Sequence, residues 1–276
     1  NQTNLGLSGG NQYATYRFSA SNYSEQGIIP NNTFRRTTVG LTSSADMFNG
    51  KLKMQSNFNF TNSGGSRIQQ GSNISGIMLG LLRTPPTFDN TNGLGAEEAV
   101  NTPASYTLPD GTQRNYLGGG GYDNPYWIVN NTPFNDVVNR VRASISLEYE
   151  VAPWLSLATN IGPDAYGDDR IQRYEIGSRG APAGQVIEDR ISFRQLDAYF
   201  FARGNTDIGD TKLNFTYNLG SNIFNTRFSR LTVQGDGLNF PGFPELSNTA
   251  TKAVFPTLTR QRSFAVFGDV GFGYDD

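Results

Sequence analysis

Three aspartates in one short stretch are the side chains whose type and spacing could most readily bind a metal ion. Asp164, Asp168 and Asp169 lie near one another and beside Arg170, and carboxylate oxygens are the ligands that Ca²⁺ prefers. Their spacing is not that of an EF-hand loop, however, and the guanidinium group of Arg170 could neutralise the cluster. We therefore predict no metal ion here and no cofactor elsewhere in the chain.

The residues that most often carry catalysis are missing from the sequence. The chain has no histidine and no cysteine among its 276 residues. It therefore lacks the most common general base, every catalytic triad built on imidazole, thiolate metal sites and disulfides. The glycine run at 118–121 does not follow a strand and open a helix, so it predicts no phosphate-binding loop. The formal net charge of −2 offers no strong field to nucleic acid or anionic lipid. We expect neither an enzyme nor a nucleic-acid partner.

A group of aromatic, amide and acidic side chains could bind a sugar or a peptide. Aromatic faces stack on sugar rings and peptide groups, while amides and carboxylates hydrogen-bond to hydroxyls. The same side chains could instead anchor a loop to itself and to the strand that follows. Both interpretations stay open for the substrate-binding candidates, which are Tyr122, Asp123, Asn124, Tyr126, Trp127, Asn130 and Asn131.

Strict alternation of polar and apolar residues follows this group, from Arg140 to Val151. Period two over that length predicts a β-strand. The chain then turns at 152–154, and Leu155 and Leu157 resume the apolar face. One face of this hairpin suits lipid, and the other would suit a water-filled lumen. The lumen-facing candidates are Arg140, Arg142, Glu148, Glu150 and, from a later strand, Tyr199 and Phe201. They could guide a substrate or form cross-strand ion pairs on a wet wall.

The same alternation recurs along the chain, and no segment shows a competing helical period. We expect about eight strands, near residues 13–23, 33–44, 51–63, 139–151, 155–161, 191–204, 211–224 and 260–274. The first ten residues are polar and predict no regular structure. No apolar run reaches the ~18 residues of a membrane helix. The mean hydropathy of −0.46 does not argue against a membrane barrel, because alternating strands hide their apolar faces from a hydropathy window.

The connections between the expected strands alternate in length. Residues 45–50, 152–154 and 205–210 form tight turns, whereas 64–138, 162–190 and 231–259 are long. A soluble sandwich has no reason to place every long loop at one end. Outer-membrane barrels do so, with short periplasmic turns and long extracellular loops.

Four residues near the expected strand ends fit a membrane interface. Trp154 and Phe48 lie beside short turns, as expected of the aromatic girdle on the periplasmic side. Arg35 and Arg194 fall on the apolar parity of their strands, next to long loops. An arginine facing lipid costs about 2–4 kcal/mol at mid-membrane and about 0–1 near the interface. We therefore expect both arginines at the extracellular rim, where they can reach lipid phosphates.

The chain resembles the barrel of SusC/RagA-type TonB-linked outer-membrane transporters of Bacteroidetes. The matching stretches, in the order that this family shows, are SNYSEQGIIPNNTFRRTTVGL (Ser21–Leu41), DNPYWIVNNTPFNDVVNRV (Asp123–Val141), APWLSLATNIGPDAYGDDR (Ala152–Arg170) and RSFAVFGDVGFGYDD (Arg262–Asp276). The NPYW…NNTPF element before a strand, followed by a W-L-S hairpin, is the most specific of them. Pro163 departs from the pattern and predicts an early end or a bulge in its strand.

The resemblance implies a transmembrane antiparallel β-barrel of about 22 strands with a plugged lumen. Residues 1–276 would then be an internal segment of the barrel domain of a longer protein, with the plug and the remaining strands elsewhere. The lumen-facing candidates would in part contact that plug. The implied activity is import of oligosaccharides or oligopeptides across the outer membrane. The implied partners are outer-membrane lipid, a SusD-like surface lipoprotein and, through the plug, the TonB–ExbB–ExbD energy-coupling complex.

Three other interpretations stay open at this point. The first is a small, complete eight-stranded barrel that acts as a passive pore or an adhesin. The second is a soluble β-sandwich that binds carbohydrate, which would need a dry core between two sheets. The third keeps the transporter-like barrel but places it in a larger surface machine. Dependence on detergent separates the sandwich from the membrane proteins, and co-purifying subunits would reveal the machine.

Overall fold

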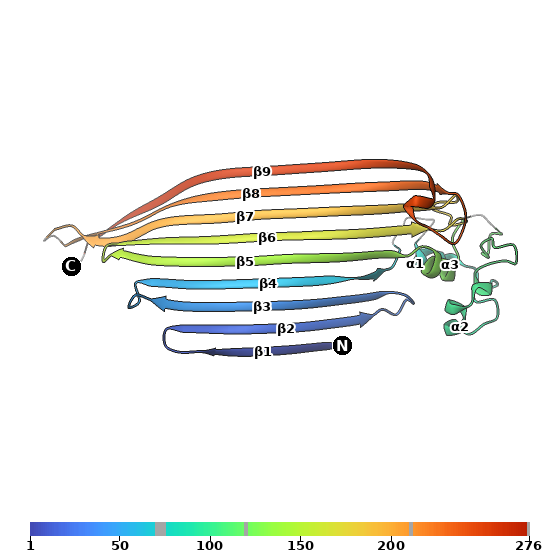
Figure 1. Cartoon of the computed structure of the whole chain (residues 1–276), viewed down its shortest axis with the longest axis horizontal. Coiled ribbons are helices and arrows are strands. Elements are labelled where there is room, and N and C mark those ends of the chain that lie inside the picture. The colour runs from blue at the N-terminus through green and yellow to red at the C-terminus, as the bar shows by residue number, and fades with distance from the viewer. Residues whose placement is uncertain (70–75, 119–120, 210–211, 275–276) are drawn as a thin grey trace.

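A single antiparallel sheet forms almost the whole molecule in the computed structural model, which describes residues 1–69, 76–118, 121–209 and 212–274. Its nine strands follow one another in chain order, each paired with its neighbours in sequence (Figure 1). The strands are β1 (Gln2–Gly10), β2 (Ala14–Gln26), β3 (Thr33–Met47), β4 (Leu52–Arg67), β5 (Phe134–Ala152), β6 (Leu155–Tyr174), β7 (Gln185–Asp207), β8 (Leu213–Leu238) and β9 (Thr249–Tyr274).

The predicted asymmetry of the connections is present. Short turns at 48–51 and 153–154 lie at one end of the sheet. The connections 175–184 and 239–248 and the described parts of the connection between β4 and β5 lie at the other (Figure 1). The described helices are short. The connection between β4 and β5 contains α1 (Ile77–Arg83), α2 (Ala96–Asn101), α3 (Pro125–Asn131) and the 3-10 turn η1 (Pro103–Ser105). A second 3-10 turn, η2 (Leu246–Asn248), lies between β8 and β9. None of the helices in the described part of the chain could serve as a membrane-spanning segment.

Cross-strand register gives the sheet two faces of opposite character. Val141 pairs with Phe60 and with Ala165, so their side chains share a face, which we call the apolar face. Large hydrophobic side chains on this face are exposed, among them Leu7, Phe18, Leu41, Phe58, Ile145, Leu157, Leu219, Ile223, Phe264 and Phe272. So large an exposed apolar surface marks an interaction with a membrane or a partner. The opposite face, which carries Arg140 and Glu148, is the polar face.

The structure corrects several predicted strand boundaries. Residues 2–10 form the edge strand β1, although we predicted no regular structure there. Leu5 and Leu7 point to the apolar face of this strand and alternate with glycine and polar residues. The expected loops at 162–190 and 231–259 are mostly strand, since β6 extends to Tyr174 and β8 to Leu238. Pro163 lies inside β6 and pairs with Leu196, so the predicted early end or bulge is wrong. The β5–β6 ladder skips the pairs between Arg142–Asp164 and Ile145–Ile161, but the register is the same on both sides.

Two of the alternative folds do not match the described residues. A sandwich needs a second sheet against the apolar face, and the described strands form one sheet with that face exposed. A closed eight-stranded barrel needs its first strand to pair with its last. In the described part of the chain there are nine strands, and β1 and β9 are the two edges of the sheet.

Candidate functional site

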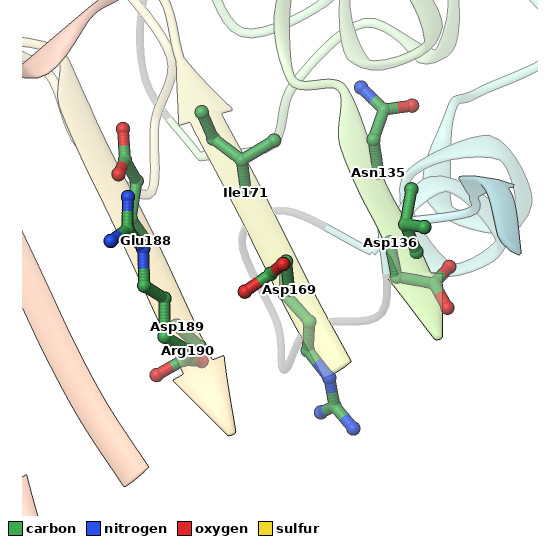
Figure 2. A pocket seen from close by; sticks show the side chains of 9 residues that line it. Asn135, Asp136, Asp169, Ile171, Glu188, Asp189 and Arg190 are labelled. Atoms are coloured by element: carbon green, nitrogen blue, oxygen red, sulfur yellow. The ribbon is translucent and has the colours of Figure 1, made fainter. Parts of the chain in front are cut away.

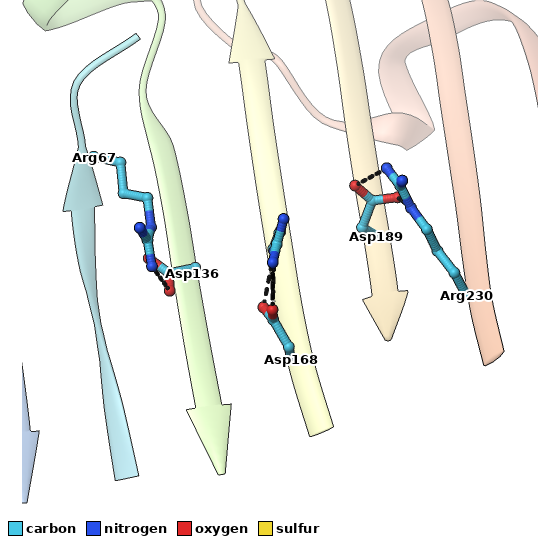
Figure 3. Close-up of polar contacts among 6 residues, drawn as sticks. Arg67, Asp136, Asp168, Asp189 and Arg230 are labelled. Carbon is cyan, nitrogen blue, oxygen red and sulfur yellow. Dashed lines mark hydrogen bonds and ion pairs between the residues drawn. The ribbon is translucent and has the colours of Figure 1, made fainter. Parts of the chain in front are cut away.

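Charged side chains on the polar face form a ladder at the end of the sheet that carries the long connections. Asp136, Arg170, Asp189 and Thr232 face one another in register across β5–β8. Arg67 reaches from β4 to Asp136, donating from Nε and Nη2 at 2.6 and 2.7 Å (Figure 3). We call the group the arginine–aspartate ladder, and its members are Arg67, Asp136, Asp168, Arg170, Asp189 and Arg230.

The ladder alternates in charge, and its carboxylates are buried. Arg170 binds Asp168 on its own strand at 2.6 Å, and Arg230 holds both carboxylate oxygens of Asp189 at 2.8 Å (Figure 3). Thr232 also donates to Asp189. Asp136, Asp168 and Asp189 are 3%, 6% and 8% exposed. The opposite charge beside each carboxylate lowers the cost of burying it, and two of the ion pairs link β4 to β5 and β7 to β8.

Four of the lumen-facing candidates lie on the polar face in the same strand, and three of them form ion pairs. Arg140 holds Asp164 through two contacts of 2.9 and 2.5 Å, and Arg142 approaches the same carboxylate at 3.5 Å. Glu148 pairs with Arg203 of β7 at 2.6 Å, whereas Glu150 forms no ion pair within the described residues. That this face borders a lumen stays a prediction.

The other two candidates belong to an aromatic strip on the same face. Tyr199 and Phe201 stack with ring centroids 6.1 Å apart, and Phe201 meets Phe267 of β9 edge-on at 5.8 Å. Farther along the sheet, Tyr166 stacks on Phe193 at 5.2 Å. Aromatic rings beside ion-paired polar groups give this face flat surfaces that could hold a sugar or a peptide.

Replacing Asp189 with asparagine tests how much the arginine–aspartate ladder contributes to the free energy of unfolding. The variant leaves the guanidinium group of Arg230 without its carboxylate on a partly buried wall. Removing one partner of a fully buried pair costs about 3–5 kcal/mol, and the half-exposed arginine here lowers the expected loss to about 1–3 kcal/mol. Urea unfolding of the purified protein in detergent would measure it. Asp269→Asn, at an exposed position of β9 on the same face without an ion pair among described residues, should change stability little, and equal losses in both variants would contradict the assignment.

The candidate group at 122–131 lies over the end of the sheet, inside the packed connection between β4 and β5. We call residues 76–118 and 121–131 of this connection the loop cluster. Asn124 is 1% exposed and caps α3, because its Oδ1 accepts from the backbone N–H of Tyr126 at 2.9 Å and proline follows at the first helical position. Its Nδ2 donates to the carbonyl oxygen of Arg114 at 2.9 Å. Asn124 therefore acts as a structural anchor.

Trp127 ties the loop cluster to the connection between β6 and β7. The side chain is 3% exposed, donates from Nε1 to Ser178 Oγ at 3.0 Å and packs edge-on against Tyr106 at 6.2 Å. Asn131 accepts at its carbonyl oxygen from the N–H of Glu175 at 3.0 Å. These contacts join two connections that lie far apart in sequence.

The more accessible members of the candidate group lie at its edge. Tyr122 stacks on Tyr116 at 6.4 Å and has the guanidinium carbon of Arg83 4.6 Å from its ring centroid. Asn130 donates to the carbonyl oxygens of Val100 and Tyr126 at 2.9 and 2.8 Å. Burial raises the pKa of the Tyr126 hydroxyl. Substrate binding by the group stays a prediction.

Asp123 is a buried carboxylate that is only half satisfied. Its Oδ1 accepts from Gln113 Nε2 at 2.6 Å and from the N–H of Arg179 at 2.8 Å, whereas Oδ2 has no hydrogen-bond partner among described residues. Burial raises the pKa of Asp123 above its usual range, and the two hydrogen bonds oppose that rise. The folded state therefore binds a proton more readily than the unfolded chain does.

This raised pKa predicts how the loop cluster responds to pH. The stability that protonation of Asp123 provides is present below its folded-state pKa and is lost as the pH rises through that pKa. Asp123→Asn should abolish this dependence and slow hydrogen exchange of residues 113–118 and 121–131 at neutral pH. Asp110 is the matched control, because hydrogen bonds from Thr112 lower its pKa, so Asp110→Asn should act in the opposite direction. Faster exchange in both variants would contradict the prediction.

The predicted acidic cluster is divided between the two faces of β6. Asp164 and Asp168 lie on the polar face in ion pairs, and Asp169 lies on the opposite face. There it borders a depression of about 460 Å³ that crosses β5–β7 together with Asn135, Ile171, Glu188 and Arg190 (Figure 2). The described residues contain no group of three or more acidic side chains placed to hold a metal ion.

Sequence reasoning did not identify the ladder or the helix that carries the candidate group. The partners in Arg67–Asp136 and Asp189–Arg230 are 69 and 41 positions apart, and only the strand register brings them together. The start of α3 had a local signal, because asparagine followed by proline is typical of a helix N-terminus. The seven-residue helix is too short to show a clear period.

Comparisons with known proteins support the fold. No family model and no curated protein matches the chain. The RagAB peptide importer matches in its closed-closed state at 14% identity and TM-score 0.71, and in its open-open state at 15% and 0.71, each over 99% of this chain and 30% of the solved chain. BauA, the ferric preacinetobactin receptor from Acinetobacter baumannii, matches at 10% identity and TM-score 0.52 over 99% of this chain and 36% of the solved chain.

These matches establish a fold shared with parts of the RagAB peptide importer and the BauA receptor. The predicted resemblance is thereby confirmed at the level of fold, which is all-β and antiparallel. The chain spans about 30% of the length of the RagAB chain that it matches.

Proposed function

We propose that this chain forms part of the barrel wall of a SusC/RagA-type, TonB-dependent transporter in the outer membrane of a Gram-negative bacterium. The observation that carries the proposal is the division of one continuous sheet into an exposed apolar face and a polar face where arginines pair with buried carboxylates. The apolar face would contact lipid, and the polar face would line the passage for a hydrated solute. The short turns would lie in the periplasm and the long connections outside the cell.

The substrate proposed for import is an oligopeptide or an oligosaccharide. The aromatic strip of Tyr199, Phe201 and Phe267 beside charged side chains would suit either class. The peptide is the first choice to test, because RagAB, the structure with the higher similarity, is a peptide importer. Tyr122, Tyr126 and Asn130, the more accessible members of the candidate group, would contact the substrate or a SusD-like lipoprotein that covers the extracellular end. Energy would come from TonB, ExbB and ExbD through a plug domain elsewhere in the parent protein.

Single cysteines can test the membrane position of the two faces, because the native chain contains none. Ile145→Cys would place a thiol on the apolar face, and Ser144→Cys would place one on the polar face of the same strand. In isolated outer membranes, a lipid-soluble maleimide should label the I145C variant, and a charged methanethiosulfonate should label the S144C variant. Equal labelling of both variants by the charged reagent would overturn the proposed lipid contact.

Transport can be tested on the parent polypeptide. Its denatured mass, measured after isolation from outer membranes, should be several times the 30.2 kDa of this chain. Cells that lack the protein should lose uptake of labelled oligopeptides or oligosaccharides, and a protonophore should have the same effect on wild-type cells. Uptake that persists with the protonophore would identify a passive pore instead.

A further inference from the structure

Arginines gather on the apolar face of β7–β9, although that face is otherwise hydrophobic. Arg194, Arg227 and Arg260 stand in one cross-strand row, since Arg194 pairs with Arg227 and Arg227 with Arg260. Arg262 lies two residues farther along β9 on the same face. All four side chains are exposed. We call these four residues the arginine patch.

The arginine patch is a cluster of four arginines with no ion-paired carboxylate among the described residues. On the polar face, Arg67, Arg140, Arg170, Arg203 and Arg230 each pair with a carboxylate. None of the four patch arginines forms an ion pair or a side-chain hydrogen bond with a described residue. Residues opposite each other on antiparallel strands are roughly 5 Å apart, and like charges in that arrangement repel. An anion between the guanidinium groups would relieve this repulsion.

The surroundings of the patch define what kind of anion fits. On the side toward the long connections, Ser192 and Ser229 form the next row of this face, and on the side toward the short turns lie Leu196 and Phe264. Two open depressions border the row, one of about 300 Å³ lined by Arg194, Leu196, Asn225, Arg227, Arg260 and Arg262. The other, of about 690 Å³, is lined by Asp169, Arg190, Ser192, Arg227, Ser229 and Leu231 among others. Cations, hydroxyls and hydrophobic side chains thus follow one another along the strands.

We propose that the arginine patch binds the phosphorylated headgroup of a lipid in the outer leaflet. Guanidinium groups bind phosphate oxygens through paired, charge-assisted hydrogen bonds. The serine hydroxyls would contact the sugar or glycerol portion, and the acyl chains would lie along Leu196, Ile223 and Phe264. A soluble phosphate has no apolar part that could contact these hydrophobic side chains. Beyond the serines, Asp169 and Glu188 carry negative charge beside the positive charge of Arg190 (Figure 2), so the uncompensated positive charge lies at the level of the patch.

This inference rests on the proposed outer-membrane location, and its test separates the two. The parent protein, purified in detergent, would be titrated with diphosphorylated lipid A and with the same lipid after removal of both phosphates, and binding read by native mass spectrometry. The Arg194→Gln/Arg227→Gln variant removes the two patch arginines that have described strands on both sides. The control is Arg17→Gln/Arg36→Gln, two exposed arginines of the polar face without a described ion pair.

We expect the wild-type protein to prefer the phosphorylated lipid, and the R194Q/R227Q variant to lose at least about ten-fold in affinity for it. The control variant should bind as the wild type does. Equal binding of both lipids, or an unchanged R194Q/R227Q variant, would overturn the lipid site. Displacement of the lipid by millimolar inorganic phosphate would overturn the lipid as the source of the anion. If the proposed outer-membrane location is wrong, the parent protein will be absent from isolated outer membranes, whatever the lipid titration shows.

Discussion

Trp127→Ala should detach the loop cluster from the connection between β6 and β7. The side chain is 3% exposed, holds Ser178 Oγ at 3.0 Å and packs on Tyr106. Removing a buried tryptophan costs about 3–5 kcal/mol, and the loss here falls on the loop cluster because no strand pairing depends on Trp127. Protease added to intact cells should therefore cut within the loop cluster of the variant much faster than in the wild type.

The second tryptophan of the chain is the control. Trp154 is 53% exposed at the short turn between β5 and β6, at the opposite end of the sheet from the loop cluster (Figure 1). Trp154→Ala should leave the rate of cleavage in the loop cluster unchanged. If Trp127→Ala leaves that rate unchanged as well, then the contacts of Asn124 and Asp123 are sufficient to hold the cluster, and the anchor role of Trp127 is wrong.

The sequence predicts strands only where one face meets a hydrophobic environment. Around Ile145 every second residue is apolar, and both the strand and its two faces are correctly predicted. Toward the long connections, both faces of the strands are polar, as in the stretch around Asp168 and Arg170 of β6. Period-two alternation disappears there, although the backbone pairing continues. The strands therefore extend farther than their patterns indicate.

The same limit applies to the charged residues. Arg194 was expected at the end of its strand beside a long loop, but β7 begins at Gln185, so Arg194 lies well inside it. Its pairing with Arg227 depends on a register that two long strands determine together. The Arg67–Asp136 and Asp189–Arg230 pairs of the ladder depend on register in the same way. Parity within a strand can be read locally, whereas the residue opposite on the next strand cannot.

Gly65→Val should cause the second large loss of stability, because the strand register places the backbone of β3 against this position. A Cβ atom at Gly65 would overlap the backbone carbonyl oxygen of Thr33 on β3, and the preceding Gly64 has the same relation to the carbonyl oxygen of Asp136 on β5. These neighbours are backbone atoms of paired strands, so they cannot move without opening the ladder of hydrogen bonds. Overpacking typically costs about 1–3 kcal/mol, and a branched side chain against backbone should reach about 3 kcal/mol.

Gly167→Val is the matched control, since Gly167 is also inside a strand but its Cβ would meet no atom within 4 Å. It lies on the apolar face, where a β-branched side chain favours strand structure by up to ~1 kcal/mol. Unfolding by urea in detergent should therefore shift in opposite directions for the two variants. The loss at Gly65 should also weaken the Arg67–Asp136 pair, because Arg67 lies two residues farther along β4. Combining Gly65→Val with Asp136→Asn should then cost less than the sum of the two single changes, and full additivity would show that the strand backbone relaxes without disturbing the ladder.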